Sequence, residues 1–308
     1  MKILRDASEF AAVSDKACVA IGFFDGVHLG HQQILRQTIS DAAEHEAASV
    51  VVTFENHPAS IVAPKRAPSL IQPTAQRLET LRSLGVDAML LLRFDQELSR
   101  QDGEAFIRSL VADFGHVCSI CVGGGFSFGR NRSGNVELLR KLGQNLGFHV
   151  HGLAAVALDG IGVSSTRIRA AISSGDFDAA NQMMGRPYEL SGTVVKGDQL
   201  GRQLGFPTAN LDIAGLTIPP NGVYAAHAKV DGASHRAAVN IGVRPTVDAA
   251  ENPPRVEACL LDFDGDLYGK TLKLTFHRKL RDEQRFDSLD ALKEQIARDF
   301  AQVRQSFA

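Results

Sequence analysis

The sequence has no tryptophan, few aromatic residues (6%) and only four cysteines among 308 residues. So few cysteines in a chain of this length do not form the disulfide framework of small secreted domains. Charge of one sign is also lacking, because the formal net charge is −2 and Lys and Arg are interleaved with acids. Without a basic stripe we expect no nucleic-acid partner.

Long hydrophobic runs are absent as well. The longest, such as 88–92 and 117–122, are far shorter than the roughly 20 residues of a membrane span, so we expect no membrane partner. Residues 1–10 contain no apolar block, which is unlike a secretory signal and predicts a cytoplasmic protein. With 44% hydrophobic and 22% charged residues, the composition is typical of a globular protein, and the length predicts two domains.

The four cysteines are candidates for metal or redox chemistry. Cys118 and Cys121 have the spacing of half a zinc site. They lie in an apolar run that predicts a strand, where residues three apart face opposite sides, and no second pair completes a tetrahedral set. We therefore expect buried structural thiols at Cys18, Cys118, Cys121 and Cys259.

The first part of the chain alternates between short apolar runs and helical patterns. The expected strands are 17–22, 49–54, 88–94 and 117–122, and the expected helices are 29–44, 74–84, 103–114 and 135–146. This order predicts a Rossmann-like α/β domain with a parallel sheet and helices on both faces. Ligands of such sheets bind in the loops at the carboxyl ends of the strands.

The pattern changes near residues 184–187. Five strand-like runs follow, at 188–196, 222–230, 235–241, 256–263 and 271–277, and then one helix at 288–300 with a Ser N-cap. We expect a small β-barrel closed by a C-terminal helix. The predicted domains are therefore 1–184 and 185–308.

A candidate phosphate site follows the first long strand, where the chain reads Phe24-Asp25-Gly26-Val27-His28-Leu29-Gly30-His31. Asp25-Gly26 is a turn signal. His28 and His31 are three apart, so both imidazoles share one face of the first helical turn. Gly30 lets a ligand approach the backbone, and the helix N-terminus attracts a polyphosphate. The alternative is a helix cap with two surface histidines.

A second candidate phosphate segment contains Ser164, Ser165 and Thr166, with Arg169 nearby. Hydroxyls and free amides at a helix start, with an arginine, suit phosphate. Taken alone, this is also an ordinary capping sequence.

The second half carries a glycine-rich segment with Gly197, Gly201 and Gly205, followed by Thr208 and Asn210. Residues i and i+2 of an extended segment share a face, so these two side chains can direct oxygens at one Mg²⁺. A turn region with incidental polar residues is the alternative.

Glu257 lies within the apolar alternation of a predicted strand. A carboxylate there suits a general base, and a structural salt bridge is the alternative.

These motifs resemble those of a known family. The His-x-Gly-His arrangement resembles the nucleotidyltransferase superfamily, and the longer run from Phe24 to His31 resembles the bacterial bifunctional riboflavin kinase/FAD synthetase. Segments 205–210, 240–246, 262–270 and 280–286 match the riboflavin kinase signature in order. The resemblance implies a nucleotidyltransferase domain followed by a riboflavin kinase barrel.

The resemblance also implies the chemistry: riboflavin and ATP give FMN, and FMN and a second ATP give FAD and pyrophosphate, with Mg²⁺ assisting. We expect a monomer or a weak homo-oligomer. The resemblance implies catalytic roles for His28, His31 and Glu257 and metal ligation by Thr208 and Asn210. ATP phosphates are expected at Phe24, Asp25, Gly26, Gly30, Ser164, Ser165, Thr166, Arg169, Gly201 and Gly205, and flavin at Phe126, Phe128, Arg281 and Phe286.

One segment departs from the family pattern. Gly125 replaces an acidic or amide side chain expected to touch substrate, and Ser127 replaces a basic one. Water or Asn131 would have to take over the lost contact. Two alternatives therefore remain: a riboflavin kinase with a degenerate first half, and a non-catalytic flavin or nucleotide sensor. The retained histidines and Glu257 argue against the sensor, which needs no base.

Overall fold

The computed structural model describes residues 1–197, 205–243 and 254–307. The chain forms two compact units. The first contains Met1–Ser69 and Thr74–Ser165, and the second contains Leu70–Pro73 and the chain from Thr166 onward. The predicted domain boundary after residue 184 stays a prediction.

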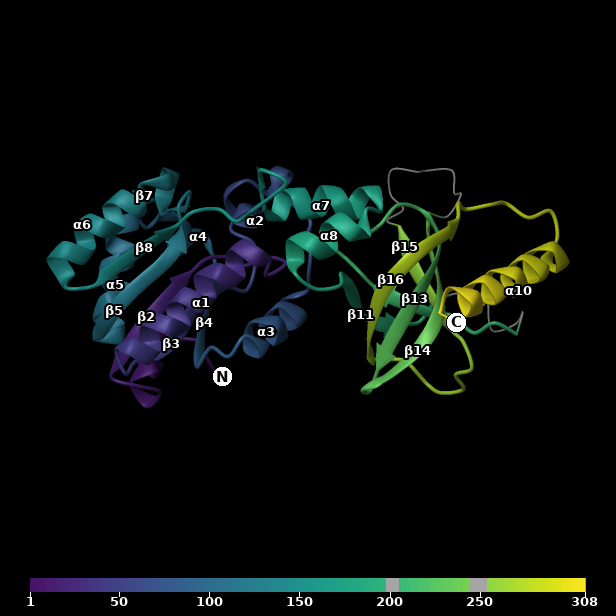
Figure 1. The fold of residues 1–308 in the computed structure, drawn as a ribbon, viewed down its shortest axis with the longest axis horizontal. Helices are drawn as coiled ribbons and strands as arrows, with labels where there is room; N and C mark the ends of the chain where they lie inside the picture. Colours follow the sequence, from purple (N-terminus) through teal and green to yellow (C-terminus); the bar gives the residue numbers. More distant parts are fainter. Residues whose placement is uncertain (198–204, 244–253, 308) are drawn as a thin grey trace. The chain divides into compact units, whose positions relative to one another are not determined.

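The first unit is built on a six-stranded parallel sheet in the order β1–β4–β3–β2–β5–β8 (Figure 1). Its strands are β1 (Lys2–Leu4), β2 (Lys16–Ile21), β3 (Ala48–Phe54), β4 (Ala88–Leu92), β5 (His116–Gly123) and β8 (His149–Leu153). The central strands are almost wholly buried, as expected of a parallel sheet covered on both faces. The chain leaves β2 toward β3 on one side and later adds β5 on the other, so the topological switch lies between β2 and β5.

Helices cover both faces of this sheet. The main ones are α1 (Leu29–Glu44), α3 (Thr74–Ser83), α5 (Gly103–Phe114) and α6 (Val136–Leu146). Leu35 of α1 and Leu81 of α3 are in one core, and Ile107 of α5 and Leu139 of α6 are in the other. The predicted α/β architecture is confirmed.

Short elements complete the first unit. They are η1 (Ala7–Ala12), α2 (Ala59–Val62), η2 (Pro64–Arg66), α4 (Gln96–Arg100), β6 (Ser127–Phe128), η3 (Arg130–Arg132), β7 (Gly134–Asn135), β9 (Ala157–Leu158) and β10 (Ile161–Gly162). None of these short elements was predicted, and neither were the edge strands β1 and β8.

The expected opposite orientation of Cys118 and Cys121 is wrong. Ala17 pairs with Val117 and Cys18 with Ser119, so Cys118 is an extra residue in a β-bulge. The bulge breaks the alternation: Cys118 packs against Ala42 of α1, and Cys121 joins the core that contains Leu35 of α1. All four cysteines are nevertheless buried, as predicted.

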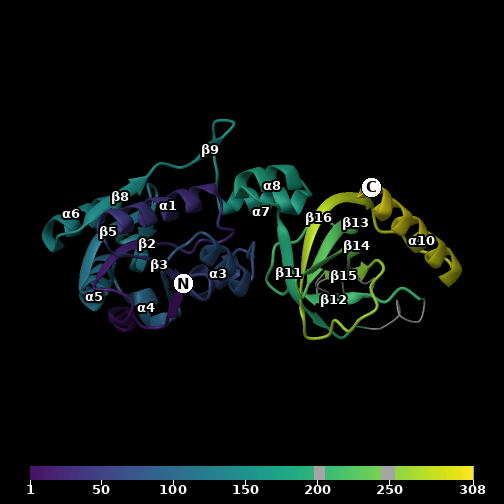
Figure 2. The same ribbon diagram turned by 60° about the horizontal axis from the view of Figure 1, so that its bottom comes forward.

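The second unit contains a closed antiparallel barrel in the order β11–β12–β15–β14–β13–β16 (Figure 2). Its strands are β11 (Glu189–Val195), β12 (Ala209–Asp212), β13 (Gly222–Val230), β14 (Ala233–Gly242), β15 (Arg255–Leu260) and β16 (Thr271–Arg281). The helices are α7 (Ser165–Ser174), whose first residue groups with the first unit, α8 (Phe177–Met184) and α10 (Leu289–Ser306).

The helix α10 closes this barrel, as predicted. It begins after Ser288, whose side chain accepts a hydrogen bond from the Ala291 amide at 3.1 Å, and it packs on β13, β14 and β16. On α8, Phe177 stacks on Phe276 of the barrel with ring centroids 5.2 Å apart. Among the described residues, no helix has the length and apolarity needed to cross a membrane.

Candidate active sites

The first site is the loop between β2 and α1. His28 is the N-cap of α1, and its Nδ1 accepts a hydrogen bond from the His31 amide at 3.3 Å. The two imidazole rings stack with centroids 3.6 Å apart, so they share one face as their spacing predicts. A Cβ on Gly30 would lie 3.2 Å from Cε1 of His28. A larger residue at position 30 would therefore crowd the His28 imidazole.

The backbone of this loop is held in an uncommon conformation. Phe24, Gly26 and Val27 have φ values of +57°, +76° and +38°. Left-handed backbone is unfavourable for phenylalanine and valine and persists only when surrounding contacts impose it. Such strain is frequent in functional loops.

Side chains from other elements provide contacts of this kind. The Ser165 hydroxyl donates to the Asp25 carbonyl at 2.9 Å, and the Gln32 amide donates to the Val27 carbonyl at 3.0 Å. Both carbonyls belong to the Asp25–Val27 turn. Ser165, predicted to bind phosphate, therefore also fixes the loop that carries the histidines.

The remaining residues predicted to bind phosphate in this segment are neighbours of Ser165 in the chain. Ser164 is half-buried and lies immediately before α7. Thr166 is exposed and Arg169 is half-buried on α7, in the part of the chain that groups with the second unit. Their phosphate contacts stay predictions.

An aromatic cavity of about 510 Å³ lies in the first unit. The predicted flavin residues Phe126 and Phe128 stack with centroids 5.2 Å apart and line it. Further walls come from Phe23, Phe54, His57, Phe94 and Phe106. Its lining also includes Ile21, the last residue of β2, and Gly22 directly after it. Together with Phe23, these residues directly precede the histidine loop in the chain, and the aromatic walls suit a flat aromatic ligand.

The two departures from the family pattern lie at this cavity or beside it. Gly125 is exposed, and a Cβ built on it meets no atom within 4 Å. Ser127 lines the cavity, as does Asn131, whose φ is +54°. The backbone at position 125 therefore has room for the side chain that this chain lacks.

The second site is formed by neighbouring strands of the barrel. Asn210 of β12 pairs with Glu257 of β15, and Glu257 pairs on its other side with Asn240 of β14. Directly opposite residues have their side chains on one face, with Cβ atoms about 4.5–5.5 Å apart. The strand register therefore sets a carboxylate between two amides. Glu257 is half-buried.

Thr208 immediately precedes β12, and the residue between it and Asn210 is buried. Its side chain therefore shares the face of Asn210, as the i, i+2 spacing predicts. Both residues line a cavity of about 530 Å³, whose other walls include Phe263, Asp266 and Tyr268. This cavity places oxygen donors beside aromatic surface.

The glycines of this segment have different roles. A Cβ on Gly197 would lie 2.3 Å from Nδ2 of Asn210, so a larger residue there would displace the Asn210 side chain. Gly205 has a φ of +86°, a conformation that favours glycine. Gly201 lies outside the described residues, and its phosphate contact stays a prediction.

Arg281 and Phe286 lie near the closing helix. Nε and Nη2 of Arg281, the last residue of β16, donate to the carboxylate of Asp299 in α10 at 2.8–3.2 Å. The side chain of Asp299 is only 4% exposed. The guanidinium also lies 5.8 Å from the ring of Phe286. The structure thus gives Arg281 a helix-anchoring contact that the sequence did not predict.

Sequence reasoning also missed most walls of the aromatic cavity. Phe23, Phe54, Phe94 and Phe106 come from four separated segments, and each alone resembles an ordinary core residue. Phe23, Phe54 and Phe94 are at the carboxyl ends of β2, β3 and β4 or just beyond them. Because ligands of such sheets bind at the carboxyl ends of the strands, these positions could have predicted the three phenylalanines as cavity walls.

Comparison with known proteins agrees with this geometry. A family model described as FAD synthetase matches residues 11–167, and one described as riboflavin kinase matches residues 184–307. A bifunctional riboflavin kinase/FMN adenylyltransferase of Pseudomonas fluorescens is 43% identical over 94% of this chain and 93% of its own length. The enzyme of the same name from Escherichia coli K12 is 36% identical over 100% and 98%.

A solved structure is similar over nearly the whole chain. The crystal structure titled as a macrolide-efflux protein from Streptococcus pneumoniae superposes with a TM-score of 0.81 at 28% identity, covering 98% of both chains. Two matched domains in order and near-complete coverage lead to one conclusion: the chain belongs to the bifunctional riboflavin kinase/FMN adenylyltransferase family.

Proposed function

We propose that the two reactions of this family are divided between the two units, with riboflavin phosphorylation in the second and FMN adenylylation in the first. The observation that carries this division is that each unit has its own cavity of about 500 Å³ beside the candidate residues for one reaction. Phosphate-binding histidines adjoin the aromatic cavity of the first unit. In the second unit, Thr208 and Asn210 line the cavity, and Glu257 is the strand partner of Asn210.

In the kinase reaction, Glu257 accepts the proton of the riboflavin 5′-hydroxyl as that oxygen attacks the γ-phosphate of ATP. The Asn210 and Asn240 amides on either side of it hold the carboxylate and the hydroxyl in line. Thr208 and Asn210 have the oxygen donors, on one face, that Mg²⁺ requires. When bound there, Mg²⁺ would neutralise charge on the ATP phosphates.

In the adenylyl transfer, an FMN phosphate oxygen attacks the α-phosphate of ATP, and pyrophosphate leaves. No protein nucleophile is required, so the protein acts by positioning and charge neutralisation. The imidazoles of His28 and His31 and the N-terminus of α1 hold the ATP phosphates. The stacked rings of Phe126 and Phe128 hold the isoalloxazine of FMN.

The finer assignments follow from the same division. Phe286 contacts the flavin in the kinase unit. Arg281, which is fixed by its ion pair with Asp299, holds the Phe286 ring in position. We also propose a cytoplasmic location and a monomer or weak homo-oligomer, with the functional boundary near residue 184.

One assay tests the proposal. Purified protein is incubated with riboflavin, ATP and Mg²⁺, and the flavins are separated by chromatography. FAD is the expected product. FMN alone would support a kinase with a degenerate first unit, an alternative that Gly125 favours. No product would support a sensor.

A further inference from the structure

Arg77 of α3 is a buried arginine outside the motifs described above. Its exposed fraction is 1%, and it is among the largest fully buried side chains of the described residues. Burying a guanidinium is costly unless hydrogen bonds or charges compensate it. A cation retained in this position therefore needs a structural or functional reason.

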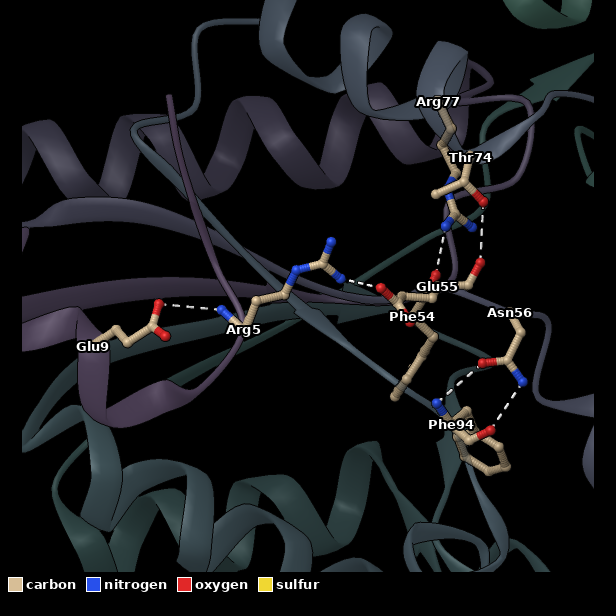
Figure 3. A network of polar contacts seen from close by, with 8 residues as sticks. All are labelled: Arg5, Glu9, Phe54, Glu55, Asn56, Thr74, Arg77 and Phe94. Atoms are coloured by element: carbon tan, nitrogen blue, oxygen red, sulfur yellow. Dashed lines mark hydrogen bonds and ion pairs between the residues drawn. The ribbon is translucent and has the colours of Figure 1, made fainter. Parts of the chain in front are cut away.

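The partners of Arg77 are backbone carbonyls at the ligand-binding edge of the sheet. Nη1 donates to the Phe23 carbonyl at 3.0 Å, and Nη2 donates to the Phe54 carbonyl. Figure 3 shows the guanidinium directed at the end of β3. One side chain thus joins the carboxyl ends of two neighbouring strands, β2 and β3.

The Phe23 carbonyl is the starting point of the strained loop. It also accepts a hydrogen bond from Thr53 Oγ1 at 3.1 Å. The residues after it turn through positive φ values to reach His28. Anchoring this carbonyl therefore restricts where the phosphate-binding histidines can lie.

The Phe23 ring extends the effect of Arg77 to the aromatic cavity. The guanidinium carbon lies 4.2 Å from the ring centroid, a cation–π distance. His57 meets the same ring edge-on at 4.6 Å, and both rings line the cavity. Arg77 thus contacts Phe23 in two ways. The Phe23 backbone leads to the proposed ATP site, and the Phe23 ring is a wall of the proposed flavin site.

The charge of Arg77 persists in this environment. Burial lowers its pKa to about 10, and the nearby charge of Asp25 opposes that shift. The guanidinium therefore stays protonated at neutral pH. It places a fixed positive charge behind the loop on which polyphosphate is proposed to bind.

We propose that Arg77 is a positioning residue for FMN adenylylation, holding the Phe23 wall of the flavin cavity and the His28 loop in one arrangement. This inference rests on the proposed function of the first unit. Neighbouring contacts hold other parts of the same edge: Asn56 donates to the Phe94 carbonyl at 2.9 Å and accepts from its amide at 3.1 Å (Figure 3). We expect removal of Arg77 to leave that segment in place and to loosen the Phe23 segment, whose carbonyl then keeps the Thr53 hydrogen bond.

The test uses Arg77→Met in the full-length chain, with Arg82→Met as the matched control. Arg82 is on the same helix and exposed. A misplacement of about 1 Å costs on the order of 100-fold in rate, so we expect kcat for FAD formation from FMN to fall at least tenfold. Since Phe23 is a cavity wall, KM for FMN should rise severalfold. FMN formation from riboflavin by the same molecules should stay within twofold.

Arg77→Lys keeps the charge but loses the two-carbonyl fork, and should recover part of the rate and of the KM. Thermal melting gives the folded fraction of each variant, and rates are expressed per folded molecule. A folded Arg77→Met protein with FAD synthesis within twofold of normal would overturn the proposal. If the methionine variant does not fold, the lysine variant decides the question. Arg77→Lys with the full wild-type rate of FAD synthesis would then overturn the proposal. Wild-type protein that makes FMN but no FAD contradicts the proposed function instead.

Discussion

In the first unit the proposed phosphate-binding histidines lie where a loop enters the first turn of α1, whereas in the second unit the proposed base Glu257 and metal ligand Asn210 are in adjacent strands, with Thr208 directly before one of them. The loop needs hydrogen bonds from Gln32 and Ser165, because its backbone is strained. The row of Asn210, Glu257 and Asn240 follows from the strand register. The loop site therefore depends on residues outside its motif, and the barrel site depends on pairing.

The sharpest way to separate the two units is Glu257→Gln. The amide keeps the shape of the side chain but cannot accept the proton, and general bases contribute about 10²–10⁴-fold. We expect the rate of riboflavin phosphorylation to decrease by a factor in that range, while the rate of FAD formation from supplied FMN is unchanged. Each half-reaction is measured with its own substrate. Glu294→Gln, exposed on α10, is the control, and near-normal FMN formation would remove Glu257 from the mechanism.

The complementary change in the first unit is His28→Asn. Asparagine is a good N-cap, so α1 is retained while the imidazole is lost. Losing one donor to developing charge costs roughly 10²–10³-fold. We expect that loss in FAD formation and none in FMN formation. His116→Asn, at an exposed position of the same unit, should have no effect. Equal losses in both reactions would contradict separate sites.

The difference between the units also explains what could be predicted from sequence. Helix α1 was predicted with its observed bounds, 29–44, because its periodicity and cap are local signals. The strand β12 was not predicted as a barrel strand, since it has only four residues after a glycine-rich segment. Its pairing with Glu257 depends on long-range register, which no local pattern encodes.

The orientation of Cys118 could not be predicted for a similar reason. Its bulge arises from pairing with β2, and alternation along β5 alone gives the wrong face. In the site, the histidine pair was visible as a motif, but Arg77 was not. One arginine in a helix resembles solvated surface until the fold places carbonyls around it.

The ion pair that anchors α10 tests how far the barrel site depends on its closing helix. Asp299→Asn leaves Arg281 without its buried counter-charge, and breaking a buried pair costs about 3–5 kcal/mol. We expect the unfolding transition of the second unit to move to lower temperature while that of the first stays in place. Calorimetry on the full chain measures both. Asp282→Asn, whose partner Lys279 forms an exposed pair, should shift neither, and an unchanged Asp299→Asn melt would exclude the anchoring role.

Gly125→Asn makes the first unit more like its family. The site has room for a side chain, and one hydrogen bond to substrate contributes about 0.5–1.5 kcal/mol. We therefore expect FAD formation to rise roughly two- to tenfold, mostly through a lower KM for FMN. Gly124→Asn gives the contrast, because its Cβ would lie 3.2 Å from the Leu153 carbonyl oxygen. No gain at position 125 would show that this chain already has another polar anchor.

The smallest effect concerns Asp41, on the part of α1 remote from the histidines. Its carboxylate accepts from Ser119 at 2.6 Å and from Gln37 at 2.7 Å, and His151 lies 3.2 Å away. Burial, the largest single influence, raises the pKa of Asp41, but the hydrogen bonds and His151 together lower it below its usual value. A lowered pKa contributes stability above the unfolded value near 3.9, and this stability is lost as pH falls through the folded value.

Asp41→Asn should therefore reduce stability by about 1 kcal/mol at neutral pH, the contribution of a hydrogen bond, and the difference should shrink below about pH 4. Melting temperatures of the first unit between pH 3 and pH 7 measure it, with exposed Asp113→Asn as control. Because Asp41 lies away from the cavity residues, both enzymatic rates should stay normal. A lower FAD rate in the folded variant would mean that the far end of α1 also positions His28, and the loop site would then depend on the whole helix.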